Sequence, residues 1–205
     1  AKSTPLPQAH ELPVLVAGER MKDVPEPASD AKDQGDVAVA DLIASYRASQ
    51  QRCKQRFLEA TGVYAAVSSS VHSAPQQARE QAETLIGACV ADLLAKGPCA
   101  VYLLADSFGQ RSAVHAVNVV VLALLLGQSL GMQAQALHGL GVSALLHDLG
   151  KVSLPSHIAE PAAMLRAADM QRYRDHVGLS VELGQSMGLS SDVLIAIAQH
   201  HEMAD

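Results

Sequence analysis

Residues 145–151 read LLHDLGK and place a histidine and an aspartate side by side at the end of an apolar stretch. Neighbouring residues on a helix point about 100° apart. A single metal ion would therefore reach both His147 and Asp148 only with help from elsewhere, whereas two ions about 3.5–4 Å apart could be bridged by the Asp148 carboxylate. An imidazole nitrogen and a carboxylate oxygen suit Fe, Mn, Zn or Ni. The alternative is a polar helix end whose hydrogen bonds are satisfied without any metal.

Other histidines lie at intervals that could bring them to the same place. His115 stands in an otherwise apolar helical segment, where a buried imidazole needs a partner. The gaps from His115 to His147, from there to His176, and from there to the pair His200-His201 are 32, 29 and 24 residues. Each gap accommodates a helix and a return. Because metal sites are commonly assembled from facing helices, we expect these side chains to meet at one end of a bundle.

Hydrophobic periodicity predicts an all-α fold for the second half of the chain. Residues 114–130 are apolar on nearly all sides, which is typical of the central helix of a bundle. A second helix is expected over 133–146, where glycines permit close packing. Shorter helices are expected over 161–176 and 180–187. A last helix is expected from residue 190 or 191 to the end of the sequence.

The first hundred residues divide by composition. Residues 1–40 hold five of the nine prolines and predict an extended leader with one short strand at 12–17. Two helices are expected in residues 41–100, the second of them after Pro75 and ending at Gly97. Neither helix carries a chemically reactive set of residues. We therefore interpret 41–100 as a regulatory region that leads into the helical domain of residues 101–205.

Composition excludes several classes of protein. The 205 residues are 49% hydrophobic and 18% charged, which excludes a disordered chain, and only 3% aromatic, which disfavours a β-sandwich. A net charge of −6 argues against a nucleic-acid polymer as partner. Three cysteines without CxxC spacing indicate neither a disulfide framework nor a cysteine zinc site. The apolar run at 119–127 is too short to span a membrane, and no signal-peptide pattern opens the sequence, so we expect a cytoplasmic protein.

Four motifs in order resemble the HD-GYP family, a branch of the HD-domain metal-dependent phosphohydrolases. They are His115, then HDLGKV at 147–152 with Leu-Pro at 154–155, then HVG at 176–178, and HHE at 200–202. The resemblance covers roughly residues 103–205, about half of the chain. It implies an HD-domain helical bundle that holds two or three divalent metal ions, often Fe or Mn. It also implies hydrolysis of cyclic di-GMP to pGpG, and in some members onward to GMP.

The resemblance also assigns roles to individual residues. The metal-ligand positions of the family coincide with His115, His147, Asp148, His176, His200 and His201. Lys151 coincides with the lysine that contacts the phosphate. Asp148 and Lys151 are thus the expected catalytic residues, and Lys151 is the expected substrate-binding residue. Neutral imidazoles leave the metals cationic toward an anionic diester, which explains how an acidic protein could bind a nucleotide.

Three positions depart from the family pattern. Arg111 stands where members with three metals have a glutamate, so two metals are expected. Residues 159–163 read AEPAA in place of a Lys-Pro-Gly and Leu-Thr segment, so the substrate-facing loop is expected to differ. The sequence stops at Asp205, the first residue of the Asp-Gly-x-Gly-Tyr-Pro signature. We therefore expect a domain truncated at its C-terminal end, and a fragment without hydrolytic activity.

Two other functions stay open at this point. The protein could be a degenerate HD-type module that binds or signals without catalysis, or an HD phosphohydrolase that acts on another nucleotide. Metal content would distinguish the first alternative, and a substrate panel would distinguish the second. The partner expected at the N-terminal region is a second copy of the chain or a signalling protein.

Overall fold

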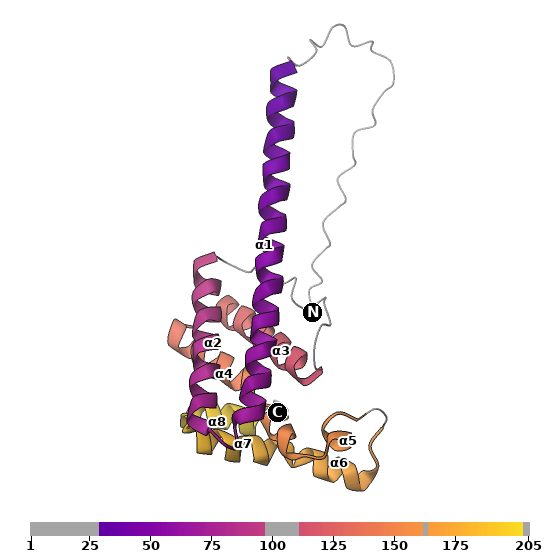
Figure 1. The fold of residues 1–205 in the computed structure, drawn as a ribbon. Coiled ribbons are helices and arrows are strands. Elements are labelled where there is room, and N and C mark those ends of the chain that lie inside the picture. Colours follow the sequence, from indigo (N-terminus) through magenta and orange to yellow (C-terminus); the bar gives the residue numbers. More distant parts are fainter. Residues whose placement is uncertain (1–28, 97–110, 162–163, 203–205) are drawn as a thin grey trace, which may run out of the picture. The chain divides into compact units, whose positions relative to one another are not determined.

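The computed structural model describes residues 29–96, 111–161 and 164–202, which form helices joined by turns and contain no strand (Figure 1). The all-α prediction is confirmed. The short strand expected at 12–17 lies outside the described residues. The chain divides into two units, residues 1–42 and 43–205, and the hydrophobic core belongs to the second unit.

Two long helices open the described part of the chain. Helix α1 spans Ser29–Ser70 and helix α2 spans Pro75–Lys96. The start of α1 falls inside the stretch for which an extended leader was predicted. No proline occurs between residues 28 and 74, so every backbone N–H in this stretch is available for the helix. Helix α2 ends directly before Gly97, as the sequence predicts.

One face of α1 enters the core. Its buried apolar side chains recur at alternating spacings of three and four residues, the spacing that keeps side chains on one face of a helix. They are Cys53, Phe57, Ala60, Tyr64, Val67 and, just beyond the helix, Val71. The C-terminal part of α1 is thus an integral part of the helical domain.

Four further helices complete the bundle (Figure 1). They are α3 (Arg111–Ser129), α4 (Ala134–Leu146), α7 (His176–Met187) and α8 (Ser191–Ala198). Helix α4 packs against α2, α3 and α8, and α7 packs against α2 and α8. The bundle therefore has α4 near its centre, and α4 ends at the His-Asp pair.

The packing around α4 depends on a glycine. A Cβ atom at Gly141 would lie 2.7 Å from a side-chain carbon of Ile86 and 3.3 Å from one of Leu124. Only a residue without a side chain allows α4 to approach α2 this closely. This position bears out the expectation that glycines in 133–146 permit close packing. Ile86 on α2 and Leu145 on α4 are both completely buried in the core.

The segment between α4 and α7 differs from the sequence prediction. It contains a 3-10 helix, η2 (Leu149–Ser153), and two short helices, α5 (Ser156–Ala159) and α6 (Ala167–Arg174). The single helix expected over 161–176 is wrong, because Arg166 has an extended backbone with φ −69° and ψ 159°. Asp175 both ends α6 and precedes α7. His176 consequently lies in the first turn of α7.

The last helix is shorter than expected. Helix α8 begins after Ser190, as predicted, but ends at Ala198, where Gln199 leaves the helical conformation with φ −103° and ψ 5°. His200 and His201 therefore lie in a turn after α8. Consecutive residues in a regular helix diverge by about 100°, and the turn frees this pair from that constraint.

Helix α3 is long and apolar enough to cross a membrane by length and composition alone, a test that core helices also pass. Its residues Ala116, Val120 and Leu124 are buried in the core of the bundle. Leu122 and Leu126 are more than half exposed, so α3 covers the core with one face and is not the central helix that the sequence predicts.

Among the described residues, Cys89 is a free thiol. The expectation that the cysteines form no disulfide framework stays a prediction.

Candidate metal centre

The six predicted ligand residues converge from four separate parts of the bundle. His115 comes from α3, His147 and Asp148 from the end of α4, His176 from the start of α7, and His200-His201 from the turn after α8. They form two groups, and within each group the potential ligand atoms lie within 4.8 Å of one another. One group is His115, His147 and Asp148, and the other is Asp148, His176, His200 and His201. Asp148 belongs to both.

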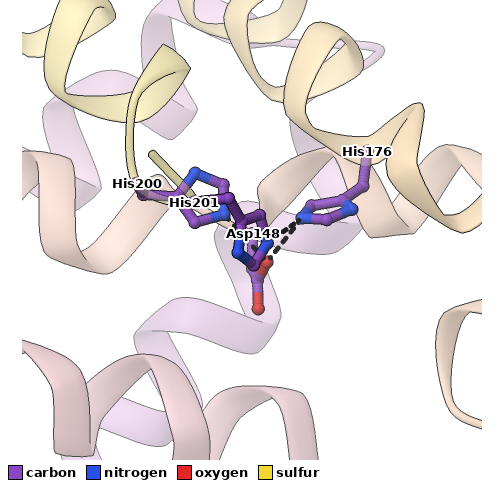
Figure 2. A group of neighbouring side chains, drawn as sticks. All are labelled: Asp148, His176, His200 and His201. Carbon is purple, nitrogen blue, oxygen red and sulfur yellow. Dashed lines mark hydrogen bonds and ion pairs between the residues drawn. The ribbon is translucent and has the colours of Figure 1, made fainter. Parts of the chain in front are cut away.

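The two carboxylate oxygens of Asp148 face different histidines. Oδ2 lies 3.3 Å from Nε2 of His147 and 3.5 Å from Nε2 of His115. Oδ1 lies 3.2 Å from Nε2 of His176 and 3.8 Å from Nε2 of His200. Figure 2 shows the ring of His176 facing Asp148, with His200 and His201 beside them. A carboxylate in this arrangement can bridge two metal ions, one on each oxygen.

Three of the imidazoles are oriented in the same way by their own backbone. Nδ1 of His147 donates to the carbonyl of Ala144 at 2.8 Å, and Nδ1 of His200 donates to the carbonyl of Ile197 at 2.7 Å. His176 makes the equivalent bond to Tyr173. A carbonyl can only accept, so Nδ1 carries the proton, and Nε2 of each neutral ring keeps its lone pair toward Asp148. Such outer hydrogen bonds are what fix the tautomer of metal-ligating histidines.

The protonation states suit metal binding. Burial alone would raise the pKa of Asp148, but its interactions with His147, His176 and Lys151 outweigh burial and hold this pKa well below its usual range. Burial lowers the pKa of His115 and of His200. Asp148 is therefore an ionised carboxylate near neutral pH, and His115 and His200 favour the neutral imidazole, the forms that coordinate metals.

Lys151 lies at the edge of the cluster. Its Nζ donates a hydrogen bond of 2.6 Å to Oδ2 of Asp148 and lies 5.0 Å from the centroid of the Tyr173 ring. Burial opposes the positive charge, but the interactions with Asp148 and Tyr173 raise the pKa of Lys151 above its usual value. The ammonium is therefore positioned as a fixed cation beside the carboxylate.

One buried nitrogen atom of the cluster has no hydrogen-bond partner within the protein. Nε2 of His200 is buried and makes no hydrogen bond, since Oδ1 of Asp148 at 3.8 Å is too distant. Buried polar atoms in proteins are nearly always satisfied. A metal ion would supply the missing partner to this lone pair. The nitrogen and oxygen donors around it fit Fe, Mn, Zn or Ni.

The cluster is open on one side. The side chain of His176 is 1% exposed and that of His115 is 54% exposed. His201 is also exposed. The cluster is thus closed toward the core of the bundle and accessible from the side of His115 and His201. A substrate could approach from that side.

Comparison with known proteins agrees with this geometry. The family model of the HD domain matches residues 88–205, more than half of the chain. The chain belongs to the HD-domain family. HD domains are metal-dependent phosphohydrolases that bind divalent metals, and the His/Asp cluster described above could hold such an ion.

Two curated relatives match parts of this HD-domain protein. Cyclic di-GMP phosphodiesterase PdeB of Borreliella burgdorferi is 26% identical over 92 residues, which is 45% of this chain and 24% of the relative. Ribonuclease Y of Mesoplasma florum is 32% identical over 97 residues, which is 47% of this chain and 16% of the relative. The chain thus aligns with a quarter or less of either relative. No solved structure gives a significant match.

Sequence reasoning missed three residues that build this HD-domain site. Tyr173 accepts the hydrogen bond from His176, and its ring lies 4.9 Å from the His176 ring. Gly150 and Ser180 join the segments that carry Asp148 and His176. Gly150 stands within the LLHDLGK motif and could have been singled out there. Tyr173 and Ser180 carry no sequence signal, because only their place in the fold brings them to the cluster.

Proposed function

We propose that the full-length protein with this HD domain is a metal-dependent phosphodiesterase that hydrolyses cyclic di-GMP to pGpG or GMP. The observation that supports this most directly is the division of the Asp148 carboxylate between two groups of histidines. A centre of that kind suits two-metal hydrolysis of a phosphodiester. The similarity to the phosphodiesterase PdeB supports the choice of substrate.

The proposed cofactors are two divalent metal ions, Fe or Mn, with Zn and Ni also compatible with the donors. The proposed ligands are His115, His147, Asp148, His176, His200 and His201. When bound, such ions would stabilise charge on the phosphate and lower the pKa of water to near neutrality. The six side chains together contribute one negative charge, because the histidines are neutral. The charge of Lys151 balances it, so the positive charge of the ions would be fully available to an anionic diester.

Lys151 and the open side of the cluster would orient the substrate. The Lys151 ammonium lies beside Oδ2 of Asp148 and above the ring of Tyr173, where it could hold a non-bridging phosphate oxygen. In the hydrolysis, the oxygen of water forms a bond to phosphorus and the P–O3′ bond breaks. The leaving oxygen takes a proton. The cyclic substrate thereby opens to linear pGpG.

A second candidate function has a specific observation in its favour. The similarity to ribonuclease Y favours an RNA phosphodiester as the substrate. The net charge of −6 weighs against it, because RNA polymers are usually bound through basic surfaces. A non-catalytic binding module is the third possibility, and it would bind a nucleotide without cleaving it.

The test is a substrate panel with the metal-loaded protein. The full-length protein is loaded with Fe or Mn without oxygen and incubated with cyclic di-GMP, with pGpG and with a short single-stranded RNA. Chromatography of the products should show pGpG formed from cyclic di-GMP by the wild type and not by Asp148→Asn. Cleavage of RNA alone would favour the ribonuclease alternative. No cleavage by fully metallated protein would favour the binding module.

A further inference from the structure

We propose that Ser180 is a positioning residue of the metal centre, whose hydroxyl accepts the backbone N–H of Gly150 and so fixes Asp148 relative to His176. This inference rests on the proposed function, because it assumes that the cluster binds metal. Ser180 itself is in neither group of potential ligands. It would act only through the backbone segments that carry two of them.

The hydrogen bond joins two buried groups. The N–H of Gly150 donates to Oγ of Ser180 over 2.7 Å, and Ser180 is 1% exposed. Gly150 lies in the first turn of η2, where backbone N–H groups have no acceptor within their own helix. A buried N–H without a partner destabilises the folded state by roughly the free energy of desolvating a polar group. Ser180 supplies the acceptor that η2 cannot supply to itself.

Close backbone packing surrounds this bond. A Cβ atom at Gly150 would overlap the carbonyl oxygen of His176 and the backbone nitrogen of Ser180. These are backbone atoms and cannot rotate away as a flexible side chain could. The backbone of η2 therefore rests directly on the first turn of α7. Glycine is required at this position, and the hydrogen bond holds the two segments at that separation.

The two segments joined by this hydrogen bond each carry a proposed metal ligand. Asp148 is two residues before Gly150, and His176 is one helical turn before Ser180. The ligand atoms of this pair, Oδ1 of Asp148 and Nε2 of His176, lie 3.2 Å apart. Metal–ligand distances are tolerated only within about 0.2 Å, so a small separation of η2 from α7 would weaken coordination. Residues that orient ligands typically change metal affinity about 10–100-fold when replaced.

The experiment compares three variants with the wild-type chain. Ser180→Ala removes the acceptor. Ser186→Ala is the matched control on the same helix, because its hydroxyl bonds only to Leu183 in its own helix. Val193→Ala, in the core on α8, controls for a general loss of stability. Titration with Mn²⁺ measures affinity, and hydrogen exchange of the Gly150 amide in metal-free protein measures the bond itself.

We expect Ser180→Ala to bind Mn²⁺ about 10–100-fold more weakly and to lose protection of the Gly150 amide. Both controls should retain wild-type affinity. Wild-type affinity in Ser180→Ala would overturn the proposal, and so would an equal loss in Val193→Ala. Unchanged exchange at Gly150 would show that the hydrogen bond does not hold η2. A wild type that binds no Mn²⁺ would instead refute the proposed function, a result seen before any variant is measured.

Discussion

Oδ1 of Asp148 lies 3.2 Å from Nε2 of His176, although the two residues are separated in sequence by η2, α5 and α6. The other oxygen of Asp148 faces His147 and His115. The carboxylate is thus the one group shared by two sets of histidines in the described part of the chain. This sharing leads to distinct expectations for each half of the centre.

Replacement of Asp148 should remove metal from both halves. Asp148→Ala deletes the shared carboxylate, so we expect metal retained after gel filtration to fall roughly tenfold or more. Elemental analysis of protein loaded with Mn²⁺ measures this. Asp192→Ala, an exposed aspartate on α8, is the matched control and should keep the wild-type content. An Asp148→Ala protein with undiminished metal would contradict the bridging role.

Variants of one exposed histidine in each group of potential ligands should remove metal from one group at a time. His115 belongs to one group and His201 to the other. His115→Ala and His201→Ala should therefore each lower the metal content by about one ion per chain, because each deletes a ligand of only one half. Elemental analysis with a Mn²⁺ titration checks this. If the double variant retained as much metal as either single variant, the two groups would not be separate sites.

Replacement of Lys151 should lower the rate of hydrolysis but not the metal content. Lys151→Met removes the ammonium that we propose to contact phosphate, and we expect hydrolysis of cyclic di-GMP to slow roughly 100-fold. Metal content should stay at the wild-type level, because the ammonium is not a ligand. Arg172→Met, at an exposed cation on α6, should leave the rate unchanged. A wild-type rate in Lys151→Met would dismiss the assigned role.

The metal-free protein should lose stability in weak acid. Burial lowers the pKa of His200 from the usual value of 6.5, so the unfolded chain binds this proton more readily than the folded protein. The corresponding stability is present above about pH 6.5 and is lost as the pH falls from there through the lowered folded pKa. The lowered pKa of His115 acts in the same direction.

Urea unfolding at pH 7.5 and pH 5.5, with a chelator present, measures this effect. His200→Gln cannot take up the proton, so its stability should fall less between these two pH values than that of the wild type. His157→Gln, an exposed histidine outside the cluster, should behave as the wild type does. An equal fall in His200→Gln would show that His200 does not contribute.

Sequence alone predicted the all-α fold and the residues that meet at the cluster. The ordered motifs around His115, His147, His176 and His200 indicate an HD domain, and the match over residues 88–205 confirms the family. Apolar periodicity located the helices of the bundle, because side chains that face a core repeat with the period of the helix. The domain boundaries, the cytoplasmic location and the N-terminal partner stay predictions.

Only the tertiary structure decided how the cluster is built. The assignment of each Asp148 oxygen to a different set of histidines, the turn that carries His200 and His201, and the bond between Gly150 and Ser180 were not predictable. Periodicity reports which side of a helix is buried, but it carries no information on the distance between side chains of different helices. Those distances depend on packing contacts between residues that are remote in sequence, such as Gly141 and Ile86. Such contacts determine where each helix ends and which side chains it faces.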